Sequence, residues 1–411
     1  MNKLLVIGFV WPEPSTTAAG NRMLQLLELF LAHGYHITFA STAAKTAYSE
    51  DLTKLGISEQ PILLNDASFN AFVADLQPHV VVYDRFMVEE QFGWRVTEVC
   101  PQALTLLNTE DLHSLRDYRA HCFKKQIDFT QSDWLQQDKT KRELTSIFRC
   151  DLTLLVSTFE IELLTRVGIP KNLLYHLPFL LPEITETTQH QWPSFEQRQH
   201  FICYGNGKHQ PNVDAYNYLK THIWPLIRQH LPTAELHIYG AYLPQQVVEM
   251  HKPTNGFLVK GWVKDLKSNV QQARVVLAPL RFGAGIKGKL TLAMQAGTPS
   301  VTTPLGAEGM FAVLPWAGNL ANSPEDLAKS AVHLYTHQNS WLVAQQRGIE
   351  LIHQHYNKGI LQALFLEKLT TLQHELPTHR TQNLVGQLLQ HQSLAATKFM
   401  GKWIEAKNTL P

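Results

Sequence analysis

The sequence carries almost no net charge and few cysteines, and each shortage excludes a class of protein. Its 411 residues have a formal net charge of +1 at pH 7, so no overall attraction draws the chain to nucleic acid or to an anionic membrane. Any anion must be recognised locally. The four cysteines lack the close spacing of a metal site or a disulfide framework, so we expect reduced thiols and no metal. They are Cys100, Cys122, Cys150 and Cys203.

Long hydrophobic runs are also missing. The first run, Leu4–Trp11, is too short to span a membrane, and the turn Pro12–Ser15 that follows it does not resemble a signal-peptide cleavage site. We interpret this run as a buried first strand. No other run approaches the roughly 18 apolar residues of a membrane span. The sequence thus predicts a cytoplasmic protein.

The sequence does contain enough apolar residues for two folded domains. Hydrophobic residues make up 44% and charged residues 17% of the chain, as in ordinary globular proteins. In both halves, short apolar strands alternate with segments of helical periodicity, which predicts βαβ units and parallel sheets. We therefore predict an α/β fold with two Rossmann-like, doubly wound domains that face a central cleft, and with a C-terminal helical tail.

Composition also predicts the domain boundaries. The polar stretch Glu183–His200 has no apolar period and is typical of a linker. We expect a first domain over 1–185, a linker over 186–199, a second domain over 200–372 and a tail over 373–411. The strands expected in the first domain are Leu4–Val10, His36–Ala40, Val80–Tyr83, Leu104–Leu107 and Leu152–Val156. Those expected in the second are Phe201–Tyr204, Glu235–Tyr239, Gly256–Val259, Val275–Ala278 and Ser300–Thr303.

Helices are predicted between and after these strands. The charged segment Asp111–Arg149 is expected to be mostly helical, and Val213–His230 is expected to form one helix. In the tail, several apolar residues share one helical face, and we expect this face to pack on the first domain, with membrane contact as the alternative. They are Leu384, Leu388, Leu389, Phe399, Trp403 and Ile404.

The strongest chemical signal is the segment Arg281–Lys289, where three glycines and three cations stand between a predicted strand and a predicted helix. Glycines allow the backbone to approach a ligand closely, and a helix start offers free N–H groups and a positive dipole end. Lysine and arginine add full charges. This composition predicts a phosphate site. Its expected members are Arg281, Lys287, Lys289 and the backbone amides of Gly283, Gly285 and Gly288.

Two familiar phosphate motifs fit this segment only partly. A P-loop requires Ser or Thr where Leu290 stands. A dinucleotide fingerprint fits Gly283, Gly285 and Gly288, with Glu308 further on, but it requires a tight turn directly after the first strand of its domain. An NAD-dependent oxidoreductase is therefore the weaker alternative.

A third interpretation comes from a family resemblance. The loop, followed by Ala293–Val301, resembles the donor-site segment of GT-B glycosyltransferases of family 4, the glycosyl transferases group 1. The opening of that family's second domain is resembled by the stretches Phe201–Gly205, Gln210–Ala215 and Ile223–Ile227, and Leu236–Ala241 and Gly261–Leu266 follow in the expected places. Parts of its first domain are resembled by Pro14–Gly20 and Ser157–Glu160. The resemblance implies a retaining, metal-independent enzyme of glycoconjugate or polysaccharide synthesis. It would transfer a sugar, expected to be a hexose, from a nucleotide-sugar to a glycan, lipid or protein acceptor, without a cofactor.

The sequence departs from the family at two positions. Members usually carry two glutamates across this loop, which contact the sugar and the ribose, and here Ala284 and Leu292 stand in their places. Glu308, after the next strand, is our candidate for a replacement carboxylate. The departure motivates an alternative function, a non-catalytic GT-B protein that binds a sugar or a protein partner.

Further candidate residues follow other predicted strands. Lys287 is our first choice for stabilising the departing diphosphate. A second glycine and cation cluster, Gly205, Gly207 and Lys208, follows the first strand of the second domain and either faces the same cleft or forms an exposed turn.

In the first domain, candidates stand at the carboxyl ends of three strands. Gly20 and Arg22 follow the first strand, and Asp84 ends the third. Asp111 and His113 follow the next strand and are candidates for sugar contact or proton transfer. The alternatives are helix caps and packed core side chains. For the acceptor, basic residues within 111–149 favour an anionic or lipid-phosphate group, unless they only solvate a helix.

Overall fold

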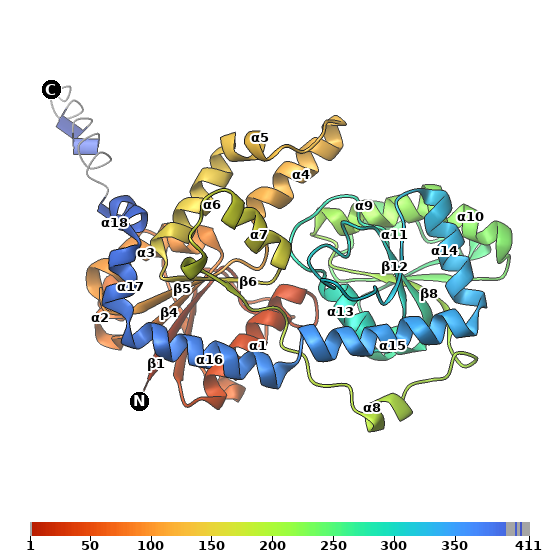
Figure 1. The fold of residues 1–411 in the computed structure, drawn as a ribbon, viewed down its shortest axis with the longest axis horizontal. Coiled ribbons are helices and arrows are strands. Elements are labelled where there is room, and N and C mark those ends of the chain that lie inside the picture. Colours follow the sequence, from red (N-terminus) through yellow and green to blue (C-terminus); the bar gives the residue numbers. More distant parts are fainter. Residues whose placement is uncertain (1, 392–398, 401–402, 405–411) are drawn as a thin grey trace.

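The protein consists of two parallel α/β domains joined by two crossings of the chain. The computed structural model describes residues 2–391, 399–400 and 403–404. The first sheet has seven strands in the order β3-β2-β1-β4-β5-β6-β7, and the second has six in the order β10-β9-β8-β11-β12-β13. All neighbouring strands are parallel. The predicted α/β fold with two Rossmann-like sheets is confirmed (Figure 1).

The strands of the first sheet are β1 Lys3–Gly8, β2 His36–Ser41, β3 Ser58–Pro61, β4 Val80–Asp84, β5 Leu104–Asn108, β6 Leu152–Leu155 and β7 Leu174–His176. Those of the second are β8 Gln199–Tyr204, β9 Leu236–Tyr239, β10 Phe257–Gly261, β11 Ala273–Ala278, β12 Ser300–Thr302 and β13 Gly318–Leu320. Three of these were not predicted, namely β3, β7 and β13. They are short strands without an apolar run, and all three are edge strands.

Helices cover both faces of each sheet. In the first domain they are α1 Ala18–Ala32, α2 Ser68–Leu76, α3 Phe86–Val99, α4 His113–Lys125, α5 Gln131–Gln136, α6 Asp138–Arg149 and α7 Thr158–Arg166, and α8 Glu186–His190 follows. In the second they are α9 Gln210–Tyr218, α10 Trp224–His230, α11 Gln245–Val248, α12 Leu266–Gln272, α13 Gly288–Gln295, α14 Pro324–Thr336 and α15 Gln338–His355. No helix in the described ranges is both long and apolar enough to cross a membrane.

The single helix predicted over Val213–His230 is wrong in one respect. A π-helical turn, Leu219–Ile223, separates α9 from α10. Pro225 stands in the first turn of α10 and lacks the N–H that a continuous α-helix would need. The charged segment 111–149 is helical as expected, in α4, α5 and α6.

Burial on both faces of the first sheet explains why its strands appear in the sequence as continuous apolar runs. Along β1, Leu5 and Ile7 belong to the hydrophobic cluster on one face of the sheet, whereas Leu4 and Val6 belong to the cluster on the other. Side chains alternate across a strand, so a sheet covered on both faces needs apolar residues at every position.

After the second domain, the chain returns to the first. The returning helices are α16 Lys358–His374, α17 Leu376–Gln382 and α18 Leu384–His391. Phe365 and Leu369 of α16 are buried in the same cluster as Leu4 and Val6. Figure 1 shows α15 and α16 in succession along one side of both domains.

The apolar face predicted for the tail is only partly in contact with the protein. Leu384 and Leu388 are mostly exposed, because α18 turns Gly386 toward the backbone of Phe148 on α6. Phe399, Trp403 and Ile404 are also exposed. The described part of the tail does contact the first domain, where Arg380 donates to Asp151 and Asn383 to the carbonyl oxygen of Phe148. Its predicted apolar side chains are exposed instead, apart from Leu389, which is partly buried.

Candidate functional site

The glycine-rich loop lies between β11 and α13 and touches the first domain. Gly285 has φ +63°, and a Cβ placed on it would lie 2.7 Å from the Cβ of Asp111. A Cβ on Gly288 would lie 2.5 Å from the Cβ of Ala18, at the start of α1. Both positions therefore require glycine, because the loop packs directly against the opposite domain.

Two of the three cations in the loop are bound only to neutral oxygens. The Lys287 ammonium donates to the carbonyl oxygens of Gly285, at 2.6 Å, and Ala284, at 3.1 Å. The Lys289 ammonium donates to Asn212 Oδ1 at 2.7 Å. Burial lowers the pKa of Lys287 to about 8 and also lowers the pKa of Lys289. Partly buried cations without an anionic partner gain from the arrival of an anion.

Arg281 is held differently. Its guanidinium forms a bidentate pair with Asp214 of α9, at 2.6 and 2.9 Å, and lies against the rings of Phe123 and Tyr218. Because Asp214 already neutralises this cation, it has less charge to offer a diphosphate than Lys287 or Lys289.

Glu308 is tied to the first domain. Arg119 of α4 forms a bidentate pair with Glu308, at 2.7 and 2.9 Å, and also donates to the carbonyl oxygen of Gly283 at 3.0 Å. No sequence pattern points to Arg119, because it lies in the middle of a charged helix. The pair holds the glycine loop against α4.

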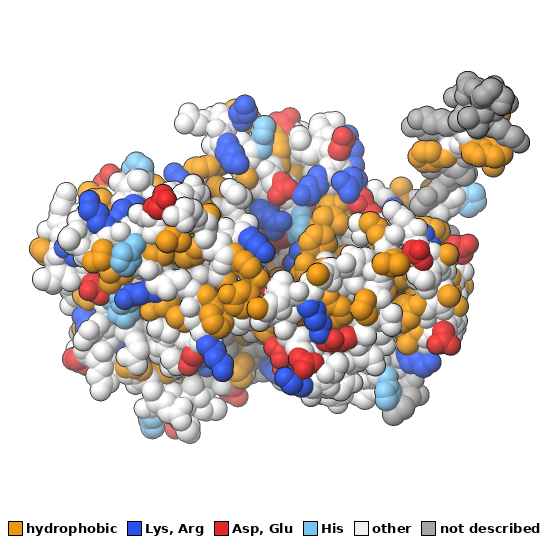
Figure 2. Space-filling model, turned by 180° about the vertical axis from the view of Figure 1, so that it is seen from behind, with side chains coloured by type: hydrophobic (Ala, Val, Ile, Leu, Met, Phe, Trp, Pro, Cys, Tyr) orange, Lys and Arg blue, Asp and Glu red, His pale blue; other side chains and the backbone are white. Residues whose placement is uncertain are grey.

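Other contacts also close the cleft. Tyr242 donates to Glu13 Oε2 at 3.1 Å, and Trp262 Nε1 donates to the carbonyl oxygen of Ser15 at 3.3 Å. On the face shown in Figure 2, basic and histidine side chains gather at the middle, between the two domains. The structure thus brings the loop 281–289 together with residues that follow the first-domain strands.

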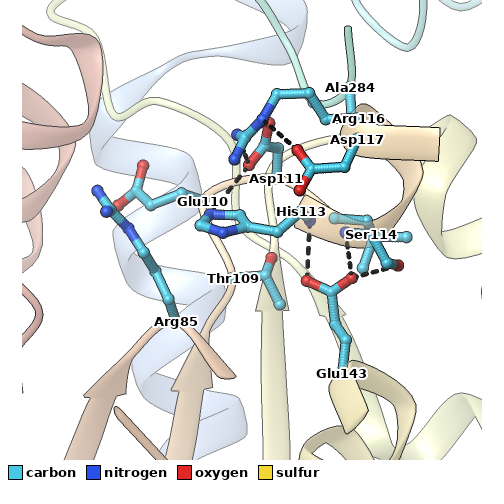
Figure 3. Close-up of polar contacts among 12 residues, drawn as sticks. Arg85, Thr109, Glu110, Asp111, His113, Ser114, Arg116, Asp117, Glu143 and Ala284 are labelled. Carbon is cyan, nitrogen blue, oxygen red and sulfur yellow. Dashed lines mark hydrogen bonds and ion pairs between the residues drawn. The ribbon is translucent and has the colours of Figure 1, made fainter. Parts of the chain in front are cut away.

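Asp111 and His113 lie together at the start of α4 (Figure 3). His113 Nε2 is 3.3 Å from Asp111 Oδ1, and Arg116 donates to both oxygens of Asp111, at 2.5 and 2.6 Å. Although burial raises the pKa of Asp111, the charge of Arg116 holds it near 2, and burial lowers the pKa of His113 to about 3. Neither group takes up a proton readily near pH 7, so this geometry favours sugar contact over proton transfer.

Glu143 of α6 caps α4. Its carboxylate accepts from the backbone N–H groups of His113, at 2.8 Å, and Ser114, at 2.9 Å, and from the Ser114 hydroxyl at 2.6 Å. Figure 3 shows it below the first turn of α4, on the side away from Glu110. Since α4 carries His113, Arg116 and Arg119, Glu143 positions the first-domain wall of the cleft.

Glu160 of α7 joins the two domains and was not singled out from the sequence. Its Oε1 accepts from the backbone N–H of Gly285, at 2.8 Å, and of Leu112, at 3.0 Å, whereas Oε2 is buried without a partner. Burial, together with the charge of Asp111, raises the pKa of Glu160 to about 8. The only sequence signal was its place at the end of the stretch Ser157–Glu160.

The remaining first-domain candidates are buried near the ends of β1 and β4. Arg22 is fully buried and donates to the carbonyl oxygen of Pro178 at 2.7 Å. Asp84 accepts from the backbone N–H of Phe9 at 3.2 Å. A Cβ on Gly20 would meet the backbone of Glu13 at 2.5 Å, so this glycine serves the packing of the loop onto α1.

The second glycine cluster forms a tight turn. Cβ atoms on Gly205 and Gly207 would meet the Asn212 side chain and the Tyr242 carbonyl oxygen, at 2.5 and 2.2 Å. Lys208 is exposed, and its ammonium lies 3.7 Å from the centre of the Tyr242 ring. Of the candidates in the second domain, Lys208 is thus the one farthest out in solvent.

Comparisons with known proteins agree with this arrangement. Residues 198–337 match the family model of the glycosyl transferases group 1. No curated protein sequence matches the chain. The family match includes the whole candidate loop and the strands β8 to β13.

Solved structures with the same fold are similar over nearly the whole chain. HepE of Anabaena, solved in complex with UDP and glucose, has a TM-score of 0.67 at 11% identity, covering 90% of this chain and 100% of its own. Sucrose-phosphate synthase of Thermosynechococcus elongatus has a TM-score of 0.63 at 16% identity, covering 90% and 99%. The structure of TarM has a TM-score of 0.67 at 9% identity, covering 90% and 98%.

These structures share the GT-B fold, and at such low identity the likeness concerns the fold alone. The family match in the second domain confirms the resemblance that the loop and the stretches around it indicate. Residues 198–337 therefore match the glycosyl transferases group 1, and the chain as a whole has the GT-B fold.

Proposed function

We propose that the chain transfers a hexose from a nucleoside diphosphate hexose, and that the loop Arg281–Lys289 binds the diphosphate of this donor. The observation that carries the proposal is the pair of partly buried lysines, Lys287 and Lys289, bonded only to neutral oxygens beside the start of α13. A UDP-hexose is the first donor to test, because HepE was solved with UDP and glucose.

The proposed chemistry places the greatest demand on the leaving group. As the bond between the anomeric carbon and the phosphate oxygen breaks, negative charge grows on the diphosphate, and the acceptor oxygen takes its place on the sugar. Lys287, Lys289 and the N–H groups at the start of α13 would stabilise this charge without rearranging. Asp111 and His113, on the opposite wall, would contact the sugar.

The location and the acceptor are part of the same proposal. We place the enzyme in the cytoplasm, with peripheral contact at the inner membrane face, and the exposed side chains Leu384, Leu388, Phe399 and Trp403 support such contact. The acceptor would be a glycan, a lipid-linked sugar or a protein, bound on the first-domain wall.

The test compares two lysines of the second domain. UDP release from UDP-glucose, UDP-galactose and UDP-N-acetylglucosamine is measured for the unchanged protein, for Lys287→Ala and for Lys208→Ala. Loss of one preorganised donor to a leaving group lowers turnover by about 100-fold or more, so we expect a loss of that size in Lys287→Ala. The exposed Lys208→Ala is the matched control and should stay within about twofold.

The same experiment also tests a second candidate function, that of a non-catalytic GT-B protein. Ala284 packs among buried apolar residues of the first domain, and Leu292 packs beside those of the second, so neither position offers a carboxylate to a donor. If no nucleotide-sugar raises the melting temperature and none is turned over, the enzyme proposal fails. The chain would then be a non-catalytic GT-B protein that binds a sugar or a protein partner.

A further inference from the structure

A group of five polar side chains lies at the carboxyl ends of β4 and β5, beside the start of α1. We call it the polar cluster, and its members are Arg22, Asp84, Arg85, Asn108 and Glu110. Asn108 Nδ2 donates to Glu110 Oε1 at 2.8 Å, and Arg85 Nε lies 3.9 Å from Asp84 Oδ1. Arg22 is near enough to Glu110 for their charges to interact.

Several buried atoms of the cluster have no hydrogen-bond partner. Arg22 and Asn108 are fully buried and Asp84 is 5% exposed, and polar atoms at such depth nearly always have a partner. The unpaired atoms are Arg22 Nε and Nη2, Asp84 Oδ1, Arg85 Nε and Asn108 Oδ1. Both donors and acceptors are thus left open in one place.

The backbone of the cluster is in an unfavourable conformation at two points. Arg85 has φ +76° and Glu110 has φ +62°, although neither is glycine. These residues follow neighbouring parallel strands, β4 and β5, whose last residues Asp84 and Asn108 are paired in register. Left-handed backbone at non-glycine residues concentrates at binding sites, where it directs side chains that regular structure would place elsewhere.

The cluster borders both the cleft and the candidate donor loop. A Cβ on Gly285 would lie 3.4 Å from the carbonyl oxygen of Glu110. Figure 3 shows the Glu110 side chain turned toward Arg85, away from the Asp111–Arg116 pair. Glu110 and Arg85 are partly exposed, and the exposed ring of Phe9 lies 4.9 Å from the Arg85 guanidinium.

We propose that the polar cluster, together with the ring of Phe9, binds the hydroxyl groups of an uncharged sugar ring. Two carboxyl groups stand beside two guanidinium groups, so the net charge of the cluster is zero when both carboxyl groups are ionised and only +1 when Glu110 holds its proton. Carboxylate oxygens accept from hydroxyls while arginine N–H groups donate to them, and an exposed aromatic ring covers the apolar face of a pyranose.

The inference rests on the proposed function, because the cluster lies beside the loop assigned to the donor. An uncharged hexose ring can come from two sources, the donor itself or a glycan acceptor. Burial, together with the charge of Asp84, raises the pKa of Glu110 to about 7, so this carboxyl group can accept from or donate to a hydroxyl near neutral pH.

The experiment uses the full chain and two variants of the cluster. Glu110→Gln keeps the shape of the side chain but removes its charge, and Phe9→Ala removes an exposed ring whose loss should not unfold the protein. Glu90→Gln is the matched control, because Glu90 forms a surface pair with Arg142 within the first domain. Thermal unfolding of each variant establishes that the fold is kept.

Two sets of probes separate the two sources. Dissociation constants for UDP, UDP-glucose and UDP-galactose report on the donor sugar. Methyl glucosides, galactosides and mannosides, added to the UDP-release reaction, report on an acceptor sugar, and glucuronic acid is the charged comparison. We expect Glu110→Gln and Phe9→Ala to change one of these two readouts by about tenfold or more. Either the dissociation constants of the UDP-hexoses rise, or the methyl hexosides lose their effect on UDP release. The affinity for UDP itself should not change.

Each outcome decides between the two claims. Weakening confined to UDP-hexoses assigns the cluster to the donor sugar, and weakening confined to methyl hexosides assigns it to the acceptor. The inference is overturned if both variants match the unchanged protein, if the unchanged protein shows no hexose-dependent effect, or if glucuronic acid competes as well as glucosides. If the unchanged protein does not bind UDP at all, the proposed function itself is overturned.

Discussion

The two walls of the cleft are built in opposite ways. The second-domain wall is one continuous loop of nine residues, Arg281–Lys289, whose charged groups are cations. The first-domain wall is assembled from residues that follow four different strands and carries the carboxyl groups Glu110, Asp111 and Glu160. One wall is thus a local motif, and the other exists only after folding.

The carboxyl groups do not repel an anion bound on the other wall, because each is neutralised in its own way. Asp111 is paired with Arg116, and Glu110 lies near the positive charges of Arg22 and Arg85. Glu160 has no cationic partner within hydrogen-bond distance among the described residues, and its raised pKa keeps it largely protonated near pH 7. The comparison teaches that the net charge of a cleft depends on these pairings more than on the number of its acids.

The largest expected effect comes from forcing the walls apart at Gly285. Gly285→Ala places a methyl group 2.7 Å from the Cβ of Asp111 and strains a backbone with φ +63°. We expect UDP release to fall by about 100-fold, since a small misplacement of the loop removes the alignment of donor and sugar-binding residues. Steady-state kinetics and thermal unfolding of the variant provide the measurement.

Gly34→Ala is the matched control for this substitution. Gly34 has φ +75° with nothing within 4 Å of an added Cβ, so it shares the strain but not the clash. Equal losses of turnover in the two variants would contradict the idea that contact between the walls matters.

A smaller effect is expected from breaking the ion pair between the walls. Arg119→Gln removes both bonds to Glu308 and the bond to the Gly283 carbonyl oxygen. We expect KM for the donor to rise by about tenfold, which corresponds to about 1.4 kcal/mol, because the closed arrangement of the loop is weakened. Arg142→Gln breaks a similar bidentate pair with Glu90 inside the first domain and should leave KM unchanged.

The same pair tests the role predicted for Glu308. If Glu308 replaces the missing family carboxylate and contacts the sugar, Glu308→Gln lowers kcat beyond the effect of Arg119→Gln. If it only holds α4, the single and double variants have equal effects, and the sugar-binding prediction for Glu308 is wrong.

The smallest expected effect concerns stability and pH. The Glu160 carboxyl group ionises near 4.5 when exposed and near 8 in the folded protein, where burial disfavours its charge. The folded state therefore holds an extra proton between these values, and the free energy of unfolding falls as pH rises from about 4.5 to about 8. In Glu160→Gln, which has no carboxyl group at this position, the free energy of unfolding should not show this decline. Urea unfolding at several pH values should show the variant gaining stability relative to the unchanged protein as pH rises from about 4.5 to about 8.

Glu90→Gln provides the comparison for this series, because Glu90 is a surface residue paired with Arg142. A stability difference between Glu160→Gln and the unchanged protein that stays constant with pH would show that Glu160 is ionised throughout. The first-domain wall would then carry a full negative charge facing Gly285.

The same contrast between a local motif and a wall assembled by folding explains which features could be predicted from the sequence. Apolar strands and a glycine-rich loop are local patterns, so the two sheets and the candidate donor loop could be predicted. Arg119, Glu143 and Glu160 could not be, because each acts through a partner 29 to 189 positions away in the chain. The short strands β3, β7 and β13 form through pairing with neighbours that only the fold supplies.

The first domain also extended further along the chain than its composition predicted. The boundary expected at residue 372 follows the polar residues of the tail, yet Phe365 and Leu369 already lie in the first-domain core. The helix α16 is apolar on that side and resembles any other core helix. Nothing in its sequence says which of two domains it covers.

The two crossings of the chain lie side by side, and Leu181 bonds through its N–H to Tyr356 and through its carbonyl oxygen to Lys358. The first domain is therefore completed in three dimensions only by residues from the far end of the chain. A protein cut in the polar linker would remain one particle, with its halves held by α16. A gene truncated after the second domain would leave the surface around Leu4, Phe30 and Val6 uncovered, so the end of the chain governs the solubility of its beginning.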